Sequence, residues 1–159
     1  MNLHPLTVHF PIALLLTGAL CDTAGILLRR DLFLKLGYLL LLLGALGAIA
    51  AAVTGDTAAE TAREIPGIRE DLDFHNDLAS AAVWLAVALT LSRTHLTFKK
   101  RFTGAVRLAY LLFALTTAAL TAASSYTGGR LVYEYGAGTE PVIRTLGEDS
   151  ERTEDRGQR

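Results

Sequence analysis

The stretch "LGYLLLLLGALGAIAAAV", residues 36–53, contains 18 residues without a single charged side chain. A helix on the surface of a soluble protein alternates apolar and polar faces, whereas this stretch is apolar on all sides. The hydrocarbon core of a bilayer requires about 20 apolar residues of helix. The stretch therefore predicts a helix that crosses a membrane.

Three further windows, residues 6–28, 78–92 and 108–126, are almost free of charge. Together with residues 36–53 they predict spanning helices at about 6–28, 36–54, 75–95 and 106–126. The first window is too long for the apolar part of a signal peptide and has no basic start, so we expect it to be retained. Because the connections are short, we expect one all-α domain, residues 1–140, built as an antiparallel four-helix transmembrane bundle.

The charged connections differ in sign. Residues 29–35 and 93–107 carry eight basic residues and one acid, whereas residues 55–77 carry seven acids and two arginines. Basic loops stay in the cytoplasm, so we expect a multi-pass protein of the bacterial inner membrane with both termini on the outer side. The formal net charge of −1 gives no reason to expect nucleic acid as a partner. We expect the helices to be surrounded by membrane lipid. The sequence is also compatible with an oligomer.

Small residues on the second predicted helix indicate where the helices pack. Gly44, Gly47, Ala48, Ala51 and Gly55 form overlapping small-xxx-small pairs, which let membrane helices approach closely. On this pattern we expect leucine in place of glycine at position 47 to disrupt the bundle.

Asp22 is the one carboxylate inside an apolar window. A charge at that depth is costly unless it pairs within the bundle. Arg93 and Arg107, at the inner ends of the third and fourth helices, are the candidate partners. We therefore expect a structural ion pair.

Histidines open two of the predicted helices. The first begins "HPLTVHFPIALLL", residues 4–16, and the third begins near His75. His9 and His75 lie at equal depth on different helices, so their imidazoles can flank a planar cofactor or meet on a metal ion. His4 is expected to support this pair, and His95 lies at the opposite face. Half-solvated interfacial histidines that bond loop carbonyls are the alternative.

The stretch "TGGRLVYEYGAG", residues 127–138, follows the fourth window. Its paired glycines predict the end of the helix, and residues 131–133 predict a short extended segment. Tyr133 or Tyr135 then either donates a hydroxyl hydrogen bond over the histidine face or anchors at the interface. Residues 141–159 are polar and highly charged, which predicts a disordered tail.

These motifs resemble those of a bacterial family of predicted membrane proteins of unknown function. The resemblance rests on the HPxxVHFP opening, the TGD at residues 54–56, His75 and the closing GGxLVYxxGxG, and it covers about residues 1–140. It implies an association with c-type cytochrome domains, and hence redox chemistry. The family often has histidine where this chain has Tyr135.

Two considerations favour haem over zinc at the histidine face. Structural zinc takes four close ligands rich in cysteine or histidine, and no such cluster is evident in the sequence. A bis-imidazole haem needs two helices and space for a flat macrocycle. We therefore predict one haem b held by His9 and His75, with Arg130 beside the propionates. The predicted function is a small b-type cytochrome or haem-bearing subunit that transfers electrons at the outer face.

Two alternatives remain open from the sequence. One is a non-haem metal-binding membrane protein that uses the same histidines, and the other is an accessory subunit of a larger respiratory complex. Catalytic residues are not predicted, because no nucleophile–base pair and no phosphate-binding loop is recognised.

Overall fold

The computed structural model describes residues 4–139 and 142, which form four long helices joined by short connections. The helices are α1 (His4–Leu27), α2 (Asp31–Ala62), α3 (Arg69–Phe98) and α4 (Gly104–Tyr135). All four are long and apolar enough to cross a membrane. The predicted all-α four-helix membrane bundle is confirmed. The predicted tail, residues 141–159, lies outside the described residues except at position 142.

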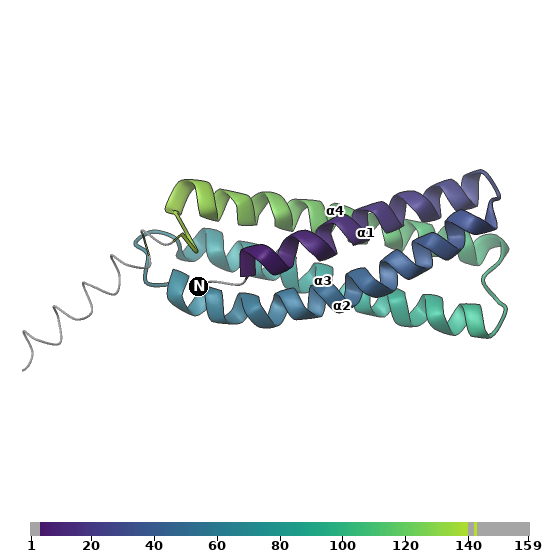
Figure 1. Cartoon of the computed structure of the whole chain (residues 1–159), viewed down its shortest axis with the longest axis horizontal. Coiled ribbons are helices and arrows are strands. Elements are labelled where there is room, and N and C mark those ends of the chain that lie inside the picture. Colours follow the sequence, from purple (N-terminus) through teal and green to yellow (C-terminus); the bar gives the residue numbers. More distant parts are fainter. Residues whose placement is uncertain (1–3, 140–141, 143–159) are drawn as a thin grey trace, which may run out of the picture.

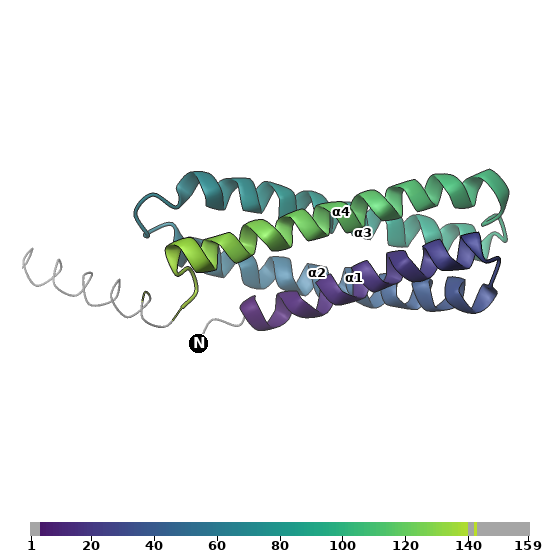
Figure 2. The same cartoon turned by 90° about the horizontal axis from the view of Figure 1, so that it is seen from above.

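The four helices run alternately up and down (Figure 1). α1 packs mainly against α2 and α3 mainly against α4, while the contacts of α2 with α3 and of α1 with α4 are less extensive. The bundle therefore consists of two tight hairpins that lie side by side (Figure 2). We call the end with the starts of α1 and α3 the histidine end, and the end with residues 28–30 and 99–103 the basic end.

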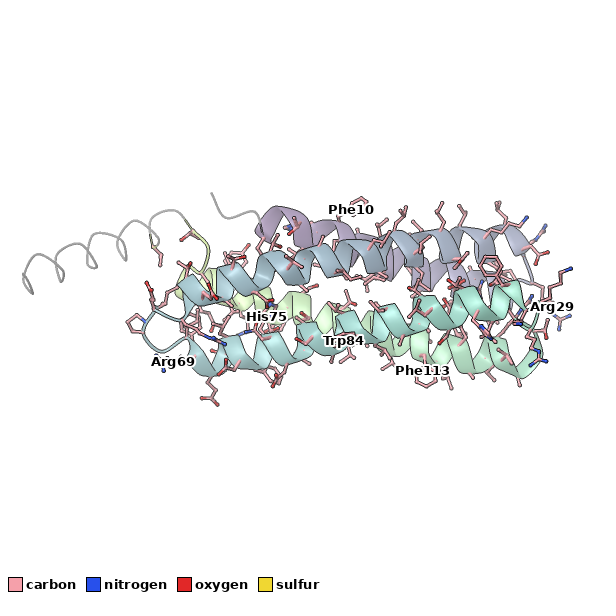
Figure 3. The ribbon with its side chains drawn as sticks, turned by 90° about the horizontal axis from the view of Figure 1, so that it is seen from below. Phe10, Arg29, Arg69, His75, Trp84 and Phe113 are labelled. Atoms are coloured by element: carbon pink, nitrogen blue, oxygen red, sulfur yellow. The ribbon has the colours of Figure 1, made fainter. Side chains whose placement is uncertain are left out.

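The outer surface of the bundle is apolar along much of its length. Phe10, Trp84 and Phe113 are 59%, 73% and 57% exposed and point away from the helix axes (Figure 3). An apolar surface of this extent is typical of a protein that contacts lipid rather than water. The exposed side chains therefore agree with the membrane assignment made from helix length.

The helices are longer than the predicted spans. α2 and α4 each contain 32 residues, which corresponds to about 48 Å of helix, against about 30 Å for the hydrocarbon core of a bilayer. α2 continues past residue 54 to Ala62, and α4 continues past residue 126 to Tyr135. The bundle therefore extends beyond the membrane core.

The predicted extended segment at residues 131–133 is wrong, because α4 continues through the paired glycines Gly128 and Gly129. Leu131 is buried in a small apolar cluster at the histidine end, and the Tyr135 hydroxyl donates a 2.6 Å hydrogen bond to Asp71. These contacts offset the weak helix propensity of glycine. The helix ends at Gly136, whose φ of 67° is the left-handed conformation that glycine favours.

The contact between α1 and α2 depends on glycines that leave no space for a side chain. A Cβ atom on Gly44 would lie 2.8 Å from a methyl carbon of Leu15, and one on Gly25 would lie 2.7 Å from Leu34. At Gly47 the nearest atoms, on Phe10 and Pro11, are 3.4 Å away, which is an ordinary contact. The small face of α2 thus packs on α1, and the fit is tighter at Gly44 than at Gly47.

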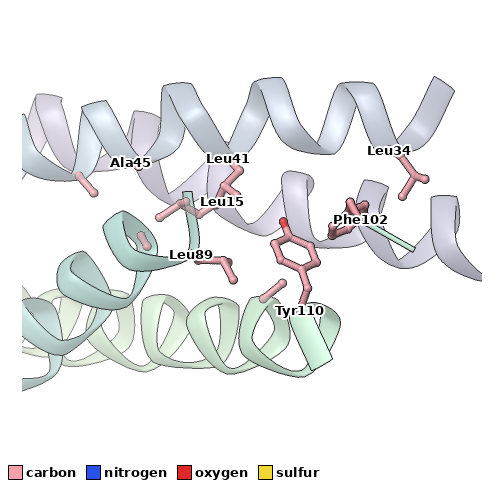
Figure 4. Close-up of a cluster of buried hydrophobic side chains, with 10 residues drawn as sticks. Leu15, Leu34, Leu41, Ala45, Leu89, Phe102 and Tyr110 are labelled. Carbon is pink, nitrogen blue, oxygen red and sulfur yellow. The ribbon is translucent and has the colours of Figure 1, made fainter. Parts of the chain in front are cut away.

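The main apolar core fills the half of the bundle nearer the basic end (Figure 4). It includes Leu15, Leu34, Leu41, Leu89 and Tyr110. A smaller cluster of Ala62, Ile68, Leu72 and Leu131 closes the histidine end. Among the described residues, the buried side chains between these two clusters are small, namely Pro11, Ala51, Ala82, Thr117 and Thr121.

Asp22 pairs with Arg93, as one of the two sequence alternatives predicts. The two side chains are 1% and 4% exposed, and an Asp22 oxygen lies 3.6 Å from an Arg93 nitrogen. The Tyr110 hydroxyl donates a 2.5 Å hydrogen bond to the other Asp22 oxygen. Arg107 instead donates to the carbonyl of Phe102. This buried network joins α1 to both helices of the other hairpin.

Candidate functional site

His4 lies in the first turn of α1 and faces α2. Its Nδ1 atom is 3.2 Å from the Thr54 hydroxyl, and its ring rests on Gly55, where a Cβ atom would lie 3.0 Å from the imidazole Cε1. Partial burial lowers the pKa of His4 below its usual value, and a bond with the Ala51 carbonyl opposes this effect. The neutral imidazole is thus favoured at this position.

His75 occupies the corresponding place between α3 and α4. Its Nδ1 atom lies 3.1 Å from the Ser124 carbonyl and 3.0 Å from the Thr127 hydroxyl. The ring rests on Gly128, where a Cβ atom would approach Cε1 to 2.9 Å. Figure 3 shows the side chain inside the bundle near the histidine end.

The bonding of His75 determines which ring nitrogen carries the proton. A carbonyl oxygen only accepts hydrogen bonds, so Nδ1 of His75 must be the donor. In the neutral ring, Nε2 then keeps its lone pair. This is the arrangement of a metal-ligating histidine, whose other ring nitrogen donates to a carbonyl or a similar acceptor.

The two imidazoles share one layer of the bundle. Each lies within range of the other's charge, and α1 and α3 run in the same direction from the histidine end (Figure 1). His4 belongs to one hairpin and His75 to the other. The boundary between the hairpins therefore passes between the two rings.

His9 does not share this layer. Its side chain is exposed on α1, one and a half turns further along the helix than His4. His95 is exposed near the basic end, as expected. The structure thus brings His4 together with His75, whereas the sequence hypothesis assigned that place to His9. The ligand assignment itself stays a prediction.

Arg130 and Tyr133, the remaining candidates, lie on the last turns of α4. The Arg130 guanidinium donates two hydrogen bonds of 2.9 and 2.8 Å to Glu134 and also pairs with Asp71 at 3.6 Å. The Tyr133 side chain is 93% exposed. Tyr135, rather than Tyr133, is bonded within the histidine end, because its hydroxyl donates a hydrogen bond to Asp71.

Thr54, Thr127 and Gly128 are site residues that the sequence analysis did not single out for a role at the histidines. The dipeptide Thr-Gly occurs at residues 17–18, 54–55, 103–104 and 127–128. Thr54 and Thr127 contact histidines that precede them by 50 and 52 residues. The sequence therefore contained no signal that separated these two pairs from the other two.

A metal site made of several side chains is not evident. Within residues 4–139, no group of three His, Cys, Asp or Glu side chains is arranged to hold a metal ion.

Comparison with known proteins assigns the chain to a family but gives no activity. A family model described as a predicted membrane protein (DUF2231) matches residues 1–141. No curated protein and no solved structure matches the chain. Since the model covers nearly the whole bundle, this chain belongs to that family of predicted membrane proteins, whose function is unknown.

Proposed function

We propose that this membrane protein is a small b-type cytochrome in which His4 and His75 would hold one haem b between the two hairpins. The observation that carries the proposal is the pairing of two imidazoles whose Nδ1 atoms are already bonded at Thr54 and Ser124. Bonding at Nδ1 of this kind is typical of a metal-ligating histidine. His4 therefore takes the role that the sequence hypothesis gave to His9.

The surroundings of the two rings fit a flat macrocycle. Gly55 and Gly128 let each imidazole lie directly against the neighbouring helix. The buried side chains of the layer are small, among them Ala82 and Thr121. Iron porphyrin with two neutral imidazole ligands exchanges single electrons without a change of ligands.

The residues of the chain have separate tasks in this proposal. His4 and His75 bind the iron, while Thr54 and Thr127 fix the ring orientations. The Arg130 guanidinium is engaged with Glu134 and Asp71. Arg130 could therefore bind a haem propionate only if it first released Glu134 or Asp71. We assign it a secondary role and give Tyr133 none.

The charges of the two ends support one orientation in the membrane. The basic end carries Arg29, Arg30 and the cluster at residues 99–101, so the positive-inside rule places it in the cytoplasm. The histidine end then faces the outer side of a bacterial inner membrane. A redox partner at that face is a soluble or tethered c-type cytochrome, in line with the family resemblance.

An absorption spectrum tests the proposal directly. The full-length protein, purified in detergent from haem-replete cells, is expected to show a low-spin haem spectrum. His4→Ala and His75→Ala should each abolish the low-spin signal. The matched control is His9→Ala, on the same helix as His4, and it should leave the spectrum unchanged.

Three results would contradict the proposal in different ways. Loss of the low-spin signal in His9→Ala but not in His4→Ala would restore the ligand pair predicted from the sequence. Stoichiometric metal without a haem spectrum would favour the metal-binding alternative. A colourless, metal-free wild-type protein would favour an accessory subunit.

A further inference from the structure

The helices α1 and α3 end in the same hydrogen-bonded turn at the basic end. The Arg30 N–H donates to the Gly25 carbonyl at 3.1 Å, and the Arg101 N–H donates to the Leu96 carbonyl at 2.9 Å. A bond from just past a helix to the carbonyl five residues earlier is the mark of a Schellman turn. The two turns lie at the same end of the bundle, one in each hairpin (Figure 1).

Each turn holds a basic residue in the left-handed conformation. Arg29 has a φ of 53° and Lys100 a φ of 52°, and no other non-glycine residue in the described part of the chain has a positive φ. Helices usually place glycine at this position, as α4 does at Gly136, because a side chain strains the backbone there. The helix dipole attracts a cation anywhere in the last turn, so it does not require the left-handed position. Two cations are therefore kept where glycine would relieve the backbone.

The basic side chains of the two turns face away from the protein. Arg29 and Arg30 follow α1, Lys100 and Arg101 follow α3, and all four are exposed. We call them the turn cations. Figure 3 shows Arg29 at the tip of the bundle. Among the described residues, the ion pairs all involve other side chains. The turn cations are thus open to an anion outside the chain.

Exposed apolar side chains lie immediately before the turn cations. Leu27 and Leu28 at the end of α1 are 72% and 62% exposed, and Phe98 at the end of α3 is 83% exposed. In a membrane protein, side chains of this kind contact acyl chains, while long basic side chains reach to the headgroups. The turn cations therefore lie at the level of the phosphates of one leaflet.

We propose that each Schellman turn of the basic end binds the phosphate of an anionic phospholipid, through Arg29 and Arg30 in one hairpin and through Lys100 and Arg101 in the other. The phosphate oxygens accept charge-assisted hydrogen bonds from the guanidinium and ammonium groups. The acyl chains of the same lipid lie against the exposed apolar side chains beside the turn. A free phosphate ion gains only the first of these contacts, so the occupant is a lipid. The inference is independent of the proposed haem.

Lipid binding by the full-length protein in neutral detergent tests the inference. Phosphatidylglycerol, phosphatidylcholine or inorganic phosphate is added, native mass spectrometry measures the lipid bound, and thermal unfolding measures stability. We expect phosphatidylglycerol to bind and to raise the midpoint temperature of unfolding, because a ligand of the folded state stabilises it. Equal stabilisation by phosphatidylcholine or by inorganic phosphate would overturn the anionic lipid as the occupant.

Substitution at the two left-handed positions separates backbone strain from lipid binding. Arg29→Gly/Lys100→Gly should raise the midpoint temperature in lipid-free detergent, because glycine adopts this conformation readily. One cation near an anionic surface is worth about fivefold in affinity, so the double variant should bind phosphatidylglycerol about 25-fold more weakly. Arg29→Lys/Lys100→Arg keeps both charges and should bind with an affinity close to that of the wild type.

Two further variants make the test specific. Arg29→Asn/Lys100→Asn removes the same charges with a residue that also tolerates the left-handed conformation, and it should lose binding as the glycine variant does. Arg63→Gln/Arg69→Gln, the matched control, removes two exposed cations at the histidine end and should keep the wild-type affinity.

Three results would overturn the proposal. Wild-type affinity in the glycine and asparagine variants would show that the turn cations do not bind the lipid. An equal loss in the control would reduce the effect to net charge. A glycine variant less stable than the wild type in lipid-free detergent would show that the left-handed positions carry no strain, and would remove the reason for placing the site there.

Discussion

Protonation of the His4 imidazole changes the stability of the folded protein. Its folded-state pKa lies below the ordinary value of 6.5 because of partial burial. As the pH falls, the unfolded chain therefore takes up a proton at this residue before the folded chain does. The stability that neutral His4 contributes is complete above its ordinary pKa and is lost as the pH falls toward the folded-state pKa.

We expect haem-free protein to lose stability in detergent as the pH falls below the ordinary histidine pKa of 6.5, and His4→Gln to reduce this dependence. Unfolding by denaturant at several pH values is the measurement. Thr57→Val, which changes an exposed side chain that does not titrate, should keep the wild-type slope. Identical slopes for the wild type and His4→Gln would contradict the assignment.

Arg93 gives a second prediction at the same scale. Arg93→Leu leaves the Asp22 carboxylate, 1% exposed, without a cation, and breaking a buried pair in this way costs about 3–5 kcal/mol. We expect a clear loss of unfolding free energy in detergent. The double variant Asp22→Asn/Arg93→Leu should recover most of it, and Arg30→Leu, at an exposed position, should have little effect. A single variant as stable as the double one would show that the pair contributes nothing.

The sequence did not determine which of the two histidines on α1 faces the interior of the bundle. His4 and His9 are five residues apart, which separates them by about 140° around a helix of 3.6 residues per turn. Which of them faces the bundle depends on the rotation of α1, and that rotation follows from contacts such as Leu15 with Gly44. The partner of Asp22 was predictable to within two arginines, because few cations lie at its depth.

At the level of elements, the uncharged windows of the sequence predicted the four helices. They did not predict the residues at which the helices end. The polar turns of α2 and α4 outside the membrane core carry no hydropathy signal. The paired glycines of α4 resembled a helix end, but the structure uses Gly128 to admit His75 and continues to Gly136. Tertiary packing thus outweighs local propensity at this point.

The paired glycines give a matched test. Gly128→Ala places a methyl group 2.9 Å from His75 Cε1, whereas Gly129→Ala places one in open space. We expect Gly128→Ala to weaken or shift the proposed haem spectrum. Gly129→Ala should stabilise the protein by up to about 1 kcal/mol through helix propensity. Absorption spectra and thermal unfolding of both variants are the measurements, and equal effects of the two would contradict the contact with His75.

For the whole molecule, the decisive expectation is that the two ends lie on opposite sides of the membrane. In a Cys21→Ala background, Gly67→Cys lies in the α2–α3 connection at the histidine end, and Lys100→Cys lies in the α3–α4 connection at the basic end. A membrane-impermeant thiol reagent applied to intact spheroplasts should label the first and spare the second until lysis. The reverse pattern would place the histidines in the cytoplasm and overturn the proposed sidedness.

Asp22 and Arg93 occupy matching places in the two hairpins, because each follows the histidine near the start of its hairpin by 18 residues. A homodimer of the first hairpin would place two Asp22 carboxylates at the position where Asp22 now meets Arg93. A homodimer of the second hairpin would bring two arginines together there. Like charges buried in a membrane repel strongly, so neither hairpin could pair with a copy of itself in this way. The buried pair therefore makes the two hairpins dependent on each other.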